Sequence, residues 1–328
     1  MDTVVSGFCV NFRGKTKGFN AIRQKGKNLT VNPDVSIMLR RLGPPPMRTQ
    51  GNVKVAFQGE LGAYSEAAAY SFFGSSAQPV PCRRFADVFR SVETGRTDFG
   101  VVPIENSIEG SVNQVYDLFL KYDHKVCGEI ALRIAHCLIA NPGTDIETMK
   151  VIYSHPQALA QCRGFLESLD CEMISTYDTA GSVKMIKEKQ LMDAGAVAGE
   201  RAAEIYSMNI LTKNISDNPH NYTRFFALSA NDAPPSGNDK TSVIFSTRHI
   251  PGALYQVLEE LSKRDINLTK IESRPTKRRP WEYNFYLDFE GHRTEEKCAE
   301  ALEGLRSKAV FVKVLGSYPK APEVTNAI

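Results

Sequence analysis

The run DFGVVPIENS, residues 98–107, decides the fold class of this chain. Its first seven residues are apolar enough for a buried strand, and the polar residues 105–107 follow directly. The pattern then changes to that of a helix near residues 112–120. A strand that ends in a polar loop and leads into a helix is the repeating unit of an α/β fold with mostly parallel strands.

The same alternation of strand and helix continues on both sides of this run. We expect helices over residues 64–73, 85–92, 156–169 and 180–189, and strands over residues 53–57, 151–153, 172–175 and 194–198. Residues 126–140 are rich in apolar and β-branched side chains and are expected to cross between two lobes. Ligands of such folds bind at the carboxyl ends of the strands. Four polar, helix-starting loops are candidates for that site, namely residues 58–65, 105–111, 154–157 and 178–182.

The pattern changes after a polar stretch rich in proline and glycine at residues 231–240, which we interpret as a linker. An amphipathic helix is expected over residues 251–264, because leucine and valine recur there at helical spacing. A second helix is expected over residues 294–305, and strands over residues 241–246, 268–274, 283–289 and 311–315. The resulting order, βαββαβ, is that of a ferredoxin-like unit.

The composition is that of a globular protein and excludes several kinds of site. Of the 328 residues, 42% are hydrophobic and 23% are charged, and no apolar stretch is long enough to span a membrane. The seven cysteines form no CxxC pair, which is typical of free thiols rather than of a disulfide framework or a zinc site. Walker A, GxGxxG and HExxH motifs are missing, so we expect no nucleotide, metal or other cofactor.

Residues 1–50 differ from the rest of the chain in charge. They contain nine basic and two acidic residues, whereas the whole chain has a net charge of +3. The remainder is therefore slightly acidic, which argues against a nucleic-acid-binding surface. We expect the basic segment to be a disordered extension, with Met47 as the functional start of a cytoplasmic enzyme. The alternative is a plastid transit peptide, because such peptides are also basic and poor in acidic residues.

Residues 218–225, NPHNYTRF, close the α/β part of the chain. Arg224 could pair with a carboxylate through its planar guanidinium, and Thr223 could donate a hydroxyl hydrogen bond. Strand propensity alone favours a plainer interpretation, a β-strand with a solvated arginine. Likewise Ser154 and Asp178 resemble helix N-caps, and for each one alone capping is the better explanation. Together, these polar positions at strand ends suggest a site for a carboxylate or phosphate ligand.

These residues resemble the signatures of the prephenate dehydratase and arogenate dehydratase family, in the order that the family has, over residues 53–318. The matching segments of the α/β part are residues 103–107 (PIENS), 154–162 (SHPQALAQC), 178–182 (DTAGS) and 223–225 (TRF). In the last unit, residues 252–254 (GAL) and 272–275 (ESRP) resemble the segments with which ACT domains of that family hold phenylalanine. Each motif is short and weak alone, but six in the correct order are specific.

The resemblance implies a two-lobed α/β catalytic domain like that of periplasmic binding proteins, over residues 53–230, with the site in the cleft between the lobes. One lobe would comprise about residues 53–130 and 215–229, and the other about residues 131–214. A ferredoxin-like βαββαβ ACT domain would follow over residues 240–320. The family works as dimers or tetramers with paired ACT domains, so a homodimer or homotetramer is implied.

The activity implied is that of a carbon–oxygen lyase, a hydro-lyase that converts prephenate to phenylpyruvate in L-phenylalanine biosynthesis under feedback by phenylalanine. Aromatisation of the ring drives this reaction without a cofactor. Thr223 is implied as the catalytic donor to the departing hydroxyl. The substrate-binding residues implied are Asn106, Ser107, Ser154, Gln161, Thr179, Arg224 and Phe225. The residues implied for allosteric phenylalanine are Gly252, Ala253, Leu254, Asn267, Leu268, Glu272, Ser273, Arg274 and Pro275.

Other functions stay open at this point. Arogenate carries an amino group where prephenate has a keto group, and no single residue assigns that choice; residues 277–281 (KRRPW) look more microbial than plant, which favours prephenate. A non-catalytic amino-acid sensor or a solute-binding protein would share the fold. The polar cleft residues and Thr223 favour an enzyme. Its expected partners are prephenate and L-phenylalanine, with neither nucleic acid nor a membrane.

Overall fold

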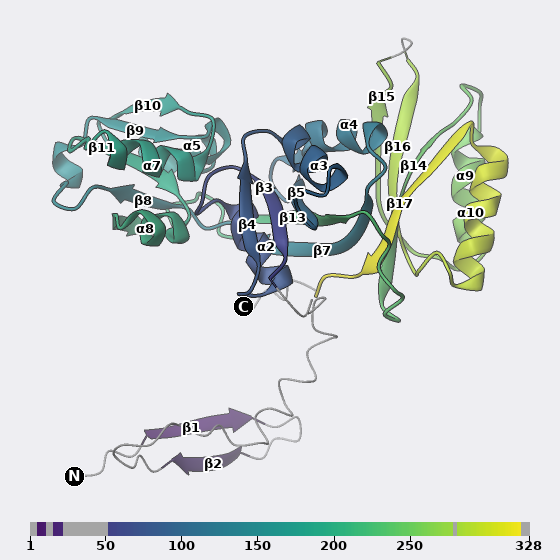
Figure 1. Cartoon of the computed structure of the whole chain (residues 1–328), viewed down its shortest axis with the longest axis horizontal. Coiled ribbons are helices and arrows are strands. Elements are labelled where there is room, and N and C mark those ends of the chain that lie inside the picture. The colour runs from purple at the N-terminus through teal and green to yellow at the C-terminus, as the bar shows by residue number, and fades with distance from the viewer. Residues whose placement is uncertain (1–4, 11–15, 22–51, 278–280, 323–328) are drawn as a thin grey trace. The chain divides into compact units, whose positions relative to one another are not determined.

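The computed structural model describes residues 5–10, 16–21, 52–277 and 281–322 (Figure 1). The chain divides into two compact units, residues 1–45 and 46–328. In the first unit, β1 (Val5–Val10) and β2 (Thr16–Ala21) pair antiparallel. The expectation of a disordered extension does not account for these two strands. Its other residues, Met47 among them, lie outside the described residues.

The first sheet of the second unit has the strand order β4-β3-β5-β13-β7, and the short β6 pairs with β5. Its strands are β3 (Lys54–Gln58), β4 (Gln78–Cys82), β5 (Phe99–Asn106), β6 (Gly110–Ser111), β7 (Lys125–Arg133) and β13 (Tyr222–Ser229). Helices α2 (Tyr64–Phe73), α3 (Phe85–Glu93) and α4 (Asn113–Lys121) connect them. Strand β13 returns from the second sheet and runs antiparallel to both of its neighbours.

The second sheet has the order β10-β9-β11-β8-β12. Its strands are β8 (Cys137–Ala140), β9 (Val151–Ser154), β10 (Glu172–Ser175), β11 (Ala194–Ala198) and β12 (Asn209–Lys213). Its helices are η2 (Ile146–Thr148), α5 (Pro156–Gln161), α6 (Arg163–Leu166), α7 (Thr179–Glu188) and α8 (Glu200–Tyr206). Strands β9, β10 and β11 are parallel, whereas β8 and β12 are antiparallel additions. Both sheets are therefore mixed, where we expected them mostly parallel, and the expected helix 156–169 is two helices that meet at Cys162.

The last sheet is antiparallel, in the order β15-β16-β14-β17. Its strands are β14 (Asp239–Ser246), β15 (Leu268–Pro275), β16 (Tyr283–Glu290) and β17 (Phe311–Pro319). Helices α9 (Ala253–Ser262) and α10 (Glu296–Lys308) cover one of its faces (Figure 1). This arrangement confirms the expected ferredoxin-like βαββαβ unit. No helix in the described parts of the chain is long and apolar enough to cross a membrane.

The other face of this last sheet shares a hydrophobic core with the first sheet. Tyr286 and Tyr318 of the last sheet are buried in one cluster with Phe119 and Phe226 of the first lobe. The Phe226 and Tyr318 rings meet edge to face, with their centroids 5.3 Å apart. Burial of apolar surface on both sides therefore fixes the ferredoxin-like unit to the first lobe.

Gly128 lies on β7 where α2 packs against the first sheet, and a Cβ atom placed there would lie 2.1 Å from the Phe72 ring. We expect Gly128→Ala to lower the free energy of unfolding by about 1–3 kcal/mol, because the ring must shift within a packed core. Urea unfolding of the full chain measures this loss. The same substitution in a Phe72→Leu background should cost less, because the ring is gone. Equal stability of Gly128→Ala and the wild type would contradict the packing.

Candidate active site

Thr223 lies near the start of β13, beside the end of β5. The strand register places it opposite Asn106, whose Nδ2 is 3.0 Å from the Thr223 hydroxyl oxygen. The orientation of this amide follows from the backbone, because Asn106 Oδ1 accepts hydrogen bonds of 3.0 Å from the N–H groups of Ile108 and Glu109. Its nitrogen must therefore donate to Thr223. The hydroxyl hydrogen of Thr223 is left to donate to another group.

The hydrogen bonds continue from Asn106 in one direction. Asn106 Nδ2 also donates to Asn221 Oδ1 at 2.7 Å, so the Asn221 nitrogen donates to Gln161 Oε1 at 2.8 Å. His136 Nε2 lies 3.1 Å from the same Gln161 oxygen, which makes Nε2 a protonated nitrogen of the imidazole. No hydrogen bond within the described ranges uses the Gln161 amide nitrogen. Thr223 thus keeps its hydroxyl hydrogen, and Gln161 keeps both hydrogens of its amide nitrogen, for a ligand.

This chain of hydrogen bonds joins the two lobes. Asn106 belongs to the first sheet and Gln161 to α5 of the second lobe, while His136 and Asn221 lie in the two segments that connect the lobes. The Tyr64 hydroxyl on α2 meets both His136 Nδ1, at 3.0 Å, and the Ala135 carbonyl oxygen, at 2.8 Å. Burial lowers the pKa of His136, although its hydrogen bond to Gln161 opposes the shift. This lowered pKa favours the neutral form of His136 in the chain of hydrogen bonds.

The two predicted serines hydrogen-bond to backbone groups and take no part in the chain of hydrogen bonds around Thr223. Ser107 Oγ accepts from the Tyr222 N–H at 3.0 Å and fastens the end of β5 to the segment before β13. Ser154 is fully buried and its hydroxyl donates to the Val197 carbonyl at 2.6 Å. It is not the expected N-cap of α5 either, because His155 takes that position. A substrate-binding role for the Ser154 hydroxyl is thus not favoured.

Thr179 begins α7, next to a second contact between the lobes. Asp178 caps this helix as expected, accepting from the Gly181 N–H at 3.3 Å, and it also accepts from the Glu60 N–H at 2.8 Å. Burial raises the pKa of Asp178, while these backbone N–H groups act against the increase. Lys184 reaches the Glu60 carboxylate at 3.0 Å. The loop after β3 is thereby held against the N-terminus of α7.

Arg224 and Phe225 do not join the cluster around Thr223. Side chains alternate along a strand, so Arg224 points to the face opposite Thr223, where it meets Asp288 and Glu129. Phe225 shares the face of Thr223 but is 2% exposed and packs in the core with Phe72. Both were expected to bind the substrate; in the structure Arg224 lies on the face of the sheet opposite Thr223, and Phe225 lies in the core.

Three residues of the site were not predicted from the sequence: Tyr64, His136 and Asn221. Asn221 stood inside the quoted run 218–225, so its nearness to Thr223 was a usable signal. Tyr64 and His136 are 72 positions apart and His136 is 25 positions before Gln161. Contacts of this range leave no spacing pattern, which is why the pattern of histidines alone gave no prediction.

The residues predicted to hold phenylalanine fall into two groups. Ser246 and Arg274 both pair with Asn284, so the loop that leads to Gly252–Leu254 and the segment Glu272–Pro275 lie at the same end of the sheet. A pocket of about 500 Å³ lies at this end, lined by residues 120, 246–249, 276, 281–285 and 310–311, and none of the nine predicted residues is among those that line it. Asn267 and Leu268 border another pocket at the opposite end of β15, about 23 Å away at 3.3 Å per residue. Within one chain they therefore do not join the first group.

Two of these residues are already engaged within the chain. Arg274 donates to Asp117 of α4 at 3.3 Å, and Glu272 accepts from the Ser111 hydroxyl. Their neighbours Ser273 and Pro275 are exposed on the other face of β15. The alternation of the strand thus divides this segment between a contact with the first lobe and a free surface.

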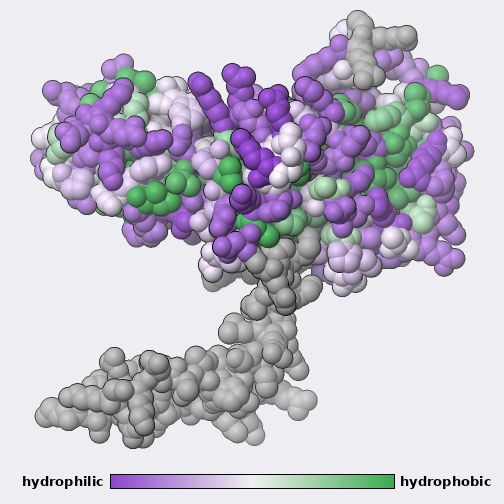
Figure 2. Space-filling view, viewed as in Figure 1, coloured by the Kyte–Doolittle hydropathy of each residue, from purple (hydrophilic) through white to green (hydrophobic). Residues whose placement is uncertain are grey.

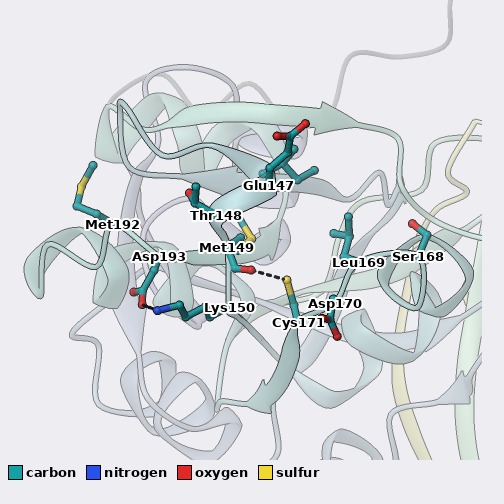
Figure 3. A pocket seen from close by; sticks show the side chains of 11 residues that line it. Glu147, Thr148, Met149, Lys150, Ser168, Leu169, Asp170, Cys171, Met192 and Asp193 are labelled. Atoms are coloured by element: carbon teal, nitrogen blue, oxygen red, sulfur yellow. Dashed lines mark hydrogen bonds and ion pairs between the residues drawn. The ribbon is translucent and has the colours of Figure 1, made fainter.

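A pocket of about 820 Å³ lies at the amino ends of the parallel strands of the second sheet (Figure 3). Residues 146–150, 168–171 and 192–193 line it, and these precede strands β9, β10 and β11. Figure 3 shows Lys150 turned toward Asp193, and Lys150 Nζ lies 3.9 Å from Asp193 Oδ2. The Cys171 thiol donates a hydrogen bond to the Met149 carbonyl oxygen. Because ligands of parallel strands bind at the carboxyl ends, this pocket is not the candidate site.

Family models match most of the described chain. The model described as Prephenate dehydratase matches residues 55–233, and the ACT domain model matches residues 241–307. A bifunctional chorismate mutase/prephenate dehydratase of Aquifex aeolicus is 48% identical over 272 residues, which are 82% of this chain and 74% of that protein. The chloroplastic arogenate dehydratase/prephenate dehydratase 2 of Arabidopsis thaliana is 44% identical over 278 residues, 81% of this chain and 73% of that protein.

Solved structures agree with these matches. A prephenate dehydratase of Arthrobacter aurescens in complex with L-Phe has a TM-score of 0.75 and 32% identity, over 82% of this chain and 90% of that one. A structure described as GqqA, a novel type of quorum quenching acylase, has the same TM-score and 33% identity, over 82% of this chain and 98% of that one.

The neutral state of His136 can be tested by NMR titration of its imidazole. We expect a pKa below the ordinary value of 6.5, because burial disfavours the cation. The unfolded chain takes up this proton first as the pH falls, so the stability that His136 contributes is present above pH 6.5 and lost as the pH falls below it. His136→Gln should flatten that decline, whereas His220→Gln, at an exposed histidine, should not. A His136 pKa above 6.5 would contradict the assignment.

Proposed function

The chain belongs to the prephenate dehydratase family, and we propose that its reaction takes place where β5, β13 and α5 meet. It catalyses the decarboxylating dehydration of prephenate to phenylpyruvate, a hydro-lyase reaction of phenylalanine biosynthesis. The observation that carries the proposed site is the one-directional chain of amide groups around Thr223. That chain leaves the buried Thr223 hydroxyl and the half-buried Gln161 amide as donors that bind no other group among the described residues.

The dehydration of prephenate requires a hydrogen-bond donor at the oxygen of the ring hydroxyl group, which is the leaving group. The bond from the ring to its carboxylate breaks, the electron pair enters the ring, and the bond to the ring hydroxyl breaks at the opposite carbon. Hydroxide is a poor leaving group, so a hydrogen bond that strengthens as negative charge develops lowers the barrier. Thr223 makes that hydrogen bond and passes its proton to the departing oxygen, which leaves as water. A proton from solvent restores the hydroxyl.

The remaining residues orient the substrate or the donors. Gln161 donates through its free amide nitrogen to a substrate oxygen, held by Asn221 and His136 at its own oxygen. Asn106 holds the Thr223 oxygen and so directs its hydrogen. Thr179 begins α7, whose first turn is already capped by the Asp178 carboxylate, so it is expected to contribute its hydroxyl to the substrate. Together these groups supply preorganised hydrogen-bond donors for the oxygens of the substrate.

Two other reactions have to be distinguished from the dehydration of prephenate. Arogenate replaces the keto group of the prephenate side chain by an amino group, and one relative of this chain carries both activities in its name. Steady-state kinetics with both substrates decides between them. Acyl hydrolysis requires an activated nucleophile, and among the described residues no acid or imidazole hydrogen-bonds the Thr223 hydroxyl. The site therefore favours dehydration.

We infer that the ACT domain binds L-phenylalanine and lowers the activity. The support is the pocket at the end of the sheet, lined by residues 246–249 before α9 and by Thr276 after β15. Gly252 at the start of α9 has φ of +77° and open space at its Cβ position, so a ligand can approach the backbone there. The related structure from Arthrobacter aurescens contains L-Phe. These features suit an amino acid with an aromatic side chain.

We also infer that two chains pair through their ACT domains. Figure 2 shows apolar surface gathered over this domain. Ile250, Tyr255 and Val310 are all more than half exposed, at 55%, 67% and 66%. A contiguous patch of exposed apolar side chains marks an interaction surface. A second chain would also bring its own Asn267 and Leu268 within reach of the first pocket, which they cannot join within one chain.

The role of Thr223 is tested by two substitutions of similar size. Thr223→Val keeps the shape and removes the hydroxyl, so kcat should fall by about 10²–10³, as for the loss of one transition-state donor. Thr223→Ser keeps the donor and should retain most of the activity. Both are measured by the formation of phenylpyruvate from prephenate. Near-normal kcat in Thr223→Val would reject this role.

The phenylalanine site is tested by calorimetry and activity assays on two glycine variants. Gly252 and Gly237 both have positive φ, +77° and +85°, and open space around them. Valine strains the backbone equally at either position, but only Gly252→Val should abolish phenylalanine binding. In the wild type, phenylalanine should weaken prephenate binding by the factor by which prephenate weakens phenylalanine binding. No binding at millimolar phenylalanine would reject the site, and binding without inhibition would reject the regulation.

A further inference from the structure

The face of the first sheet that is turned away from Thr223 carries a cluster of charged side chains. Arg224 lies at its centre, with Nη2 2.5 Å from Asp288 Oδ2 and Nη1 3.3 Å from Glu129 Oε1. Its Nε is 3.6 Å from Glu105 Oε2. Asp288 belongs to β16 of the ACT domain, whereas Glu105 and Glu129 belong to the first sheet. A single guanidinium thus connects the catalytic sheet with the ACT sheet.

Two lysines of the ACT sheet complete the cluster from the other side. Lys240 Nζ of β14 lies 3.0 Å from Glu129 Oε1, and Lys270 Nζ of β15 lies 2.7 Å from Glu105 Oε1. Lys270 also lies 3.3 Å from Glu272 on its own strand. Each carboxylate of the first sheet is therefore held by Arg224 from its own sheet and by one lysine from the ACT domain.

The cluster is largely withdrawn from water. The Arg224 side chain is 16% exposed, Asp288 7% and Glu129 3%. Burial disfavours the charged guanidinium, but the nearby anions, Asp288 foremost, outweigh it and raise the pKa of Arg224. Buried charges that are paired in this way are held in one geometry, because loss of either partner leaves the other uncompensated. Arg224, Asp288 and Glu129 consequently form a rigid connection, whereas Glu105, whose side chain is 34% exposed, is the more accessible member of the cluster.

The backbone carries this connection straight to the candidate site. Arg224 follows Thr223 on β13, and Glu105 precedes Asn106 on β5. The same two rungs of the sheet pair Thr223 with Asn106 and Arg224 with Glu105. One side of these rungs holds the hydroxyl donor and its supporting amide, and the other side holds the charges that reach the ACT domain. The Asn106–Thr223 hydrogen bond and the charged side chains are therefore attached to the same two rungs of the sheet.

We propose that Arg224 is a positioning residue, which together with Glu105 fixes the Asn106–Thr223 pair from behind and passes the state of the ACT sheet to it. This inference rests on the proposed function of Thr223. Arg224 does not contact the substrate and acts only through the strand that it shares with Thr223.

Glu105 is the element of the cluster with two possible arrangements. It is close to Lys270, at 2.7 Å, but distant from Arg224, at 3.6 Å. The Nε atom of Arg224 is buried and has no hydrogen-bond partner among the described residues. Lys270 lies on β15, and Thr276, directly after this strand, lines the ACT pocket. Displacement of β15 would release Glu105 from Lys270 and let it complete the bond to Arg224 Nε. Regulation requires a two-state contact of this kind.

A direct clamp on the substrate makes a different prediction for the same arginine. If Arg224 held a substrate carboxylate, its loss would raise KM. A positioning residue changes the geometry of the donor in the transition state, so its loss lowers kcat and leaves KM nearly unchanged. A partner on the ACT sheet, Asp288, would be irrelevant to a clamp but essential to a positioning residue. Kinetics of variants at Arg224 and Asp288 therefore separate the two roles.

The experiment compares Arg224→Lys, Asp288→Asn and their double variant with the wild-type full chain, by kcat, KM for prephenate and the phenylalanine concentration for half-inhibition. Arg224→Lys keeps the charge but loses the fork, and kcat should fall roughly tenfold or more with little change in KM. Asp288→Asn should shift half-inhibition by about fivefold or more, as for the loss of an allosteric coupling. The double variant should be no worse than the more impaired single variant, because both break one connection.

Arg264→Gln is the matched control. Arg264 follows α9 in the ACT domain, outside the cluster, and its Nη1 lies 2.9 Å from Oε2 of Glu260 on that helix. The substitution should leave kcat and inhibition unchanged. If Arg224→Lys unfolds in a thermal melt, Asp288→Asn and Glu105→Gln carry the test through the same readouts. A raised KM at unchanged kcat, or variants that match the wild type in kcat and inhibition, would overturn the proposal. A wild type without prephenate dehydratase activity would instead reject the proposed function.

Discussion

Alternation of side chains along β13 is the constraint on which the rest of the structure depends. The chain leaves the first lobe, builds the second, and returns to place β13 between β5 and β7 in the middle of the first sheet. A central strand has two buried faces, so neighbouring residues serve different environments. Thr223 faces the junction of the lobes, and Arg224 faces the ACT domain. A shift of register by one residue would exchange the two and remove both functions.

The ACT domain shares a hydrophobic core with the catalytic sheet. Ile244 and Leu315 of the ACT sheet belong to the same buried cluster as Val102 and Leu228 of the first lobe. A packed interface of this kind has few intermediate positions and shifts between discrete arrangements. The segment 231–240, interpreted as a linker, ends inside β14, where Asp239 accepts from the N–H groups of residues 236 and 237. The domains are therefore joined by packing more than by a tether.

Much of the fold was predictable because local pattern and tertiary environment agree. Helix 64–73 and strands 172–175 and 194–198 have the predicted bounds. Strand β4, residues 78–82, was not predicted, because its two prolines indicate a break. It lies at the edge of the sheet, where a proline without an N–H costs no ladder bond on the open side. The mixed strand directions were equally hidden, since direction depends on which strands meet and not on the residues of one strand.

The residue types of the candidate site were predictable from the sequence, but the directions of their hydrogen bonds were not. Asn106, Gln161 and Thr223 were named from short motifs, and the fold brings them together across 117 positions of sequence. Their function, however, depends on which end of each amide donates, and that is set by the N–H groups of residues 108 and 109 behind Asn106. Arg224 shows the same limit from the other side, because a guanidinium suits a substrate carboxylate and a buried Asp288 equally well. Residue identity defines what a side chain is able to bind, and only its face of the strand decides what it meets.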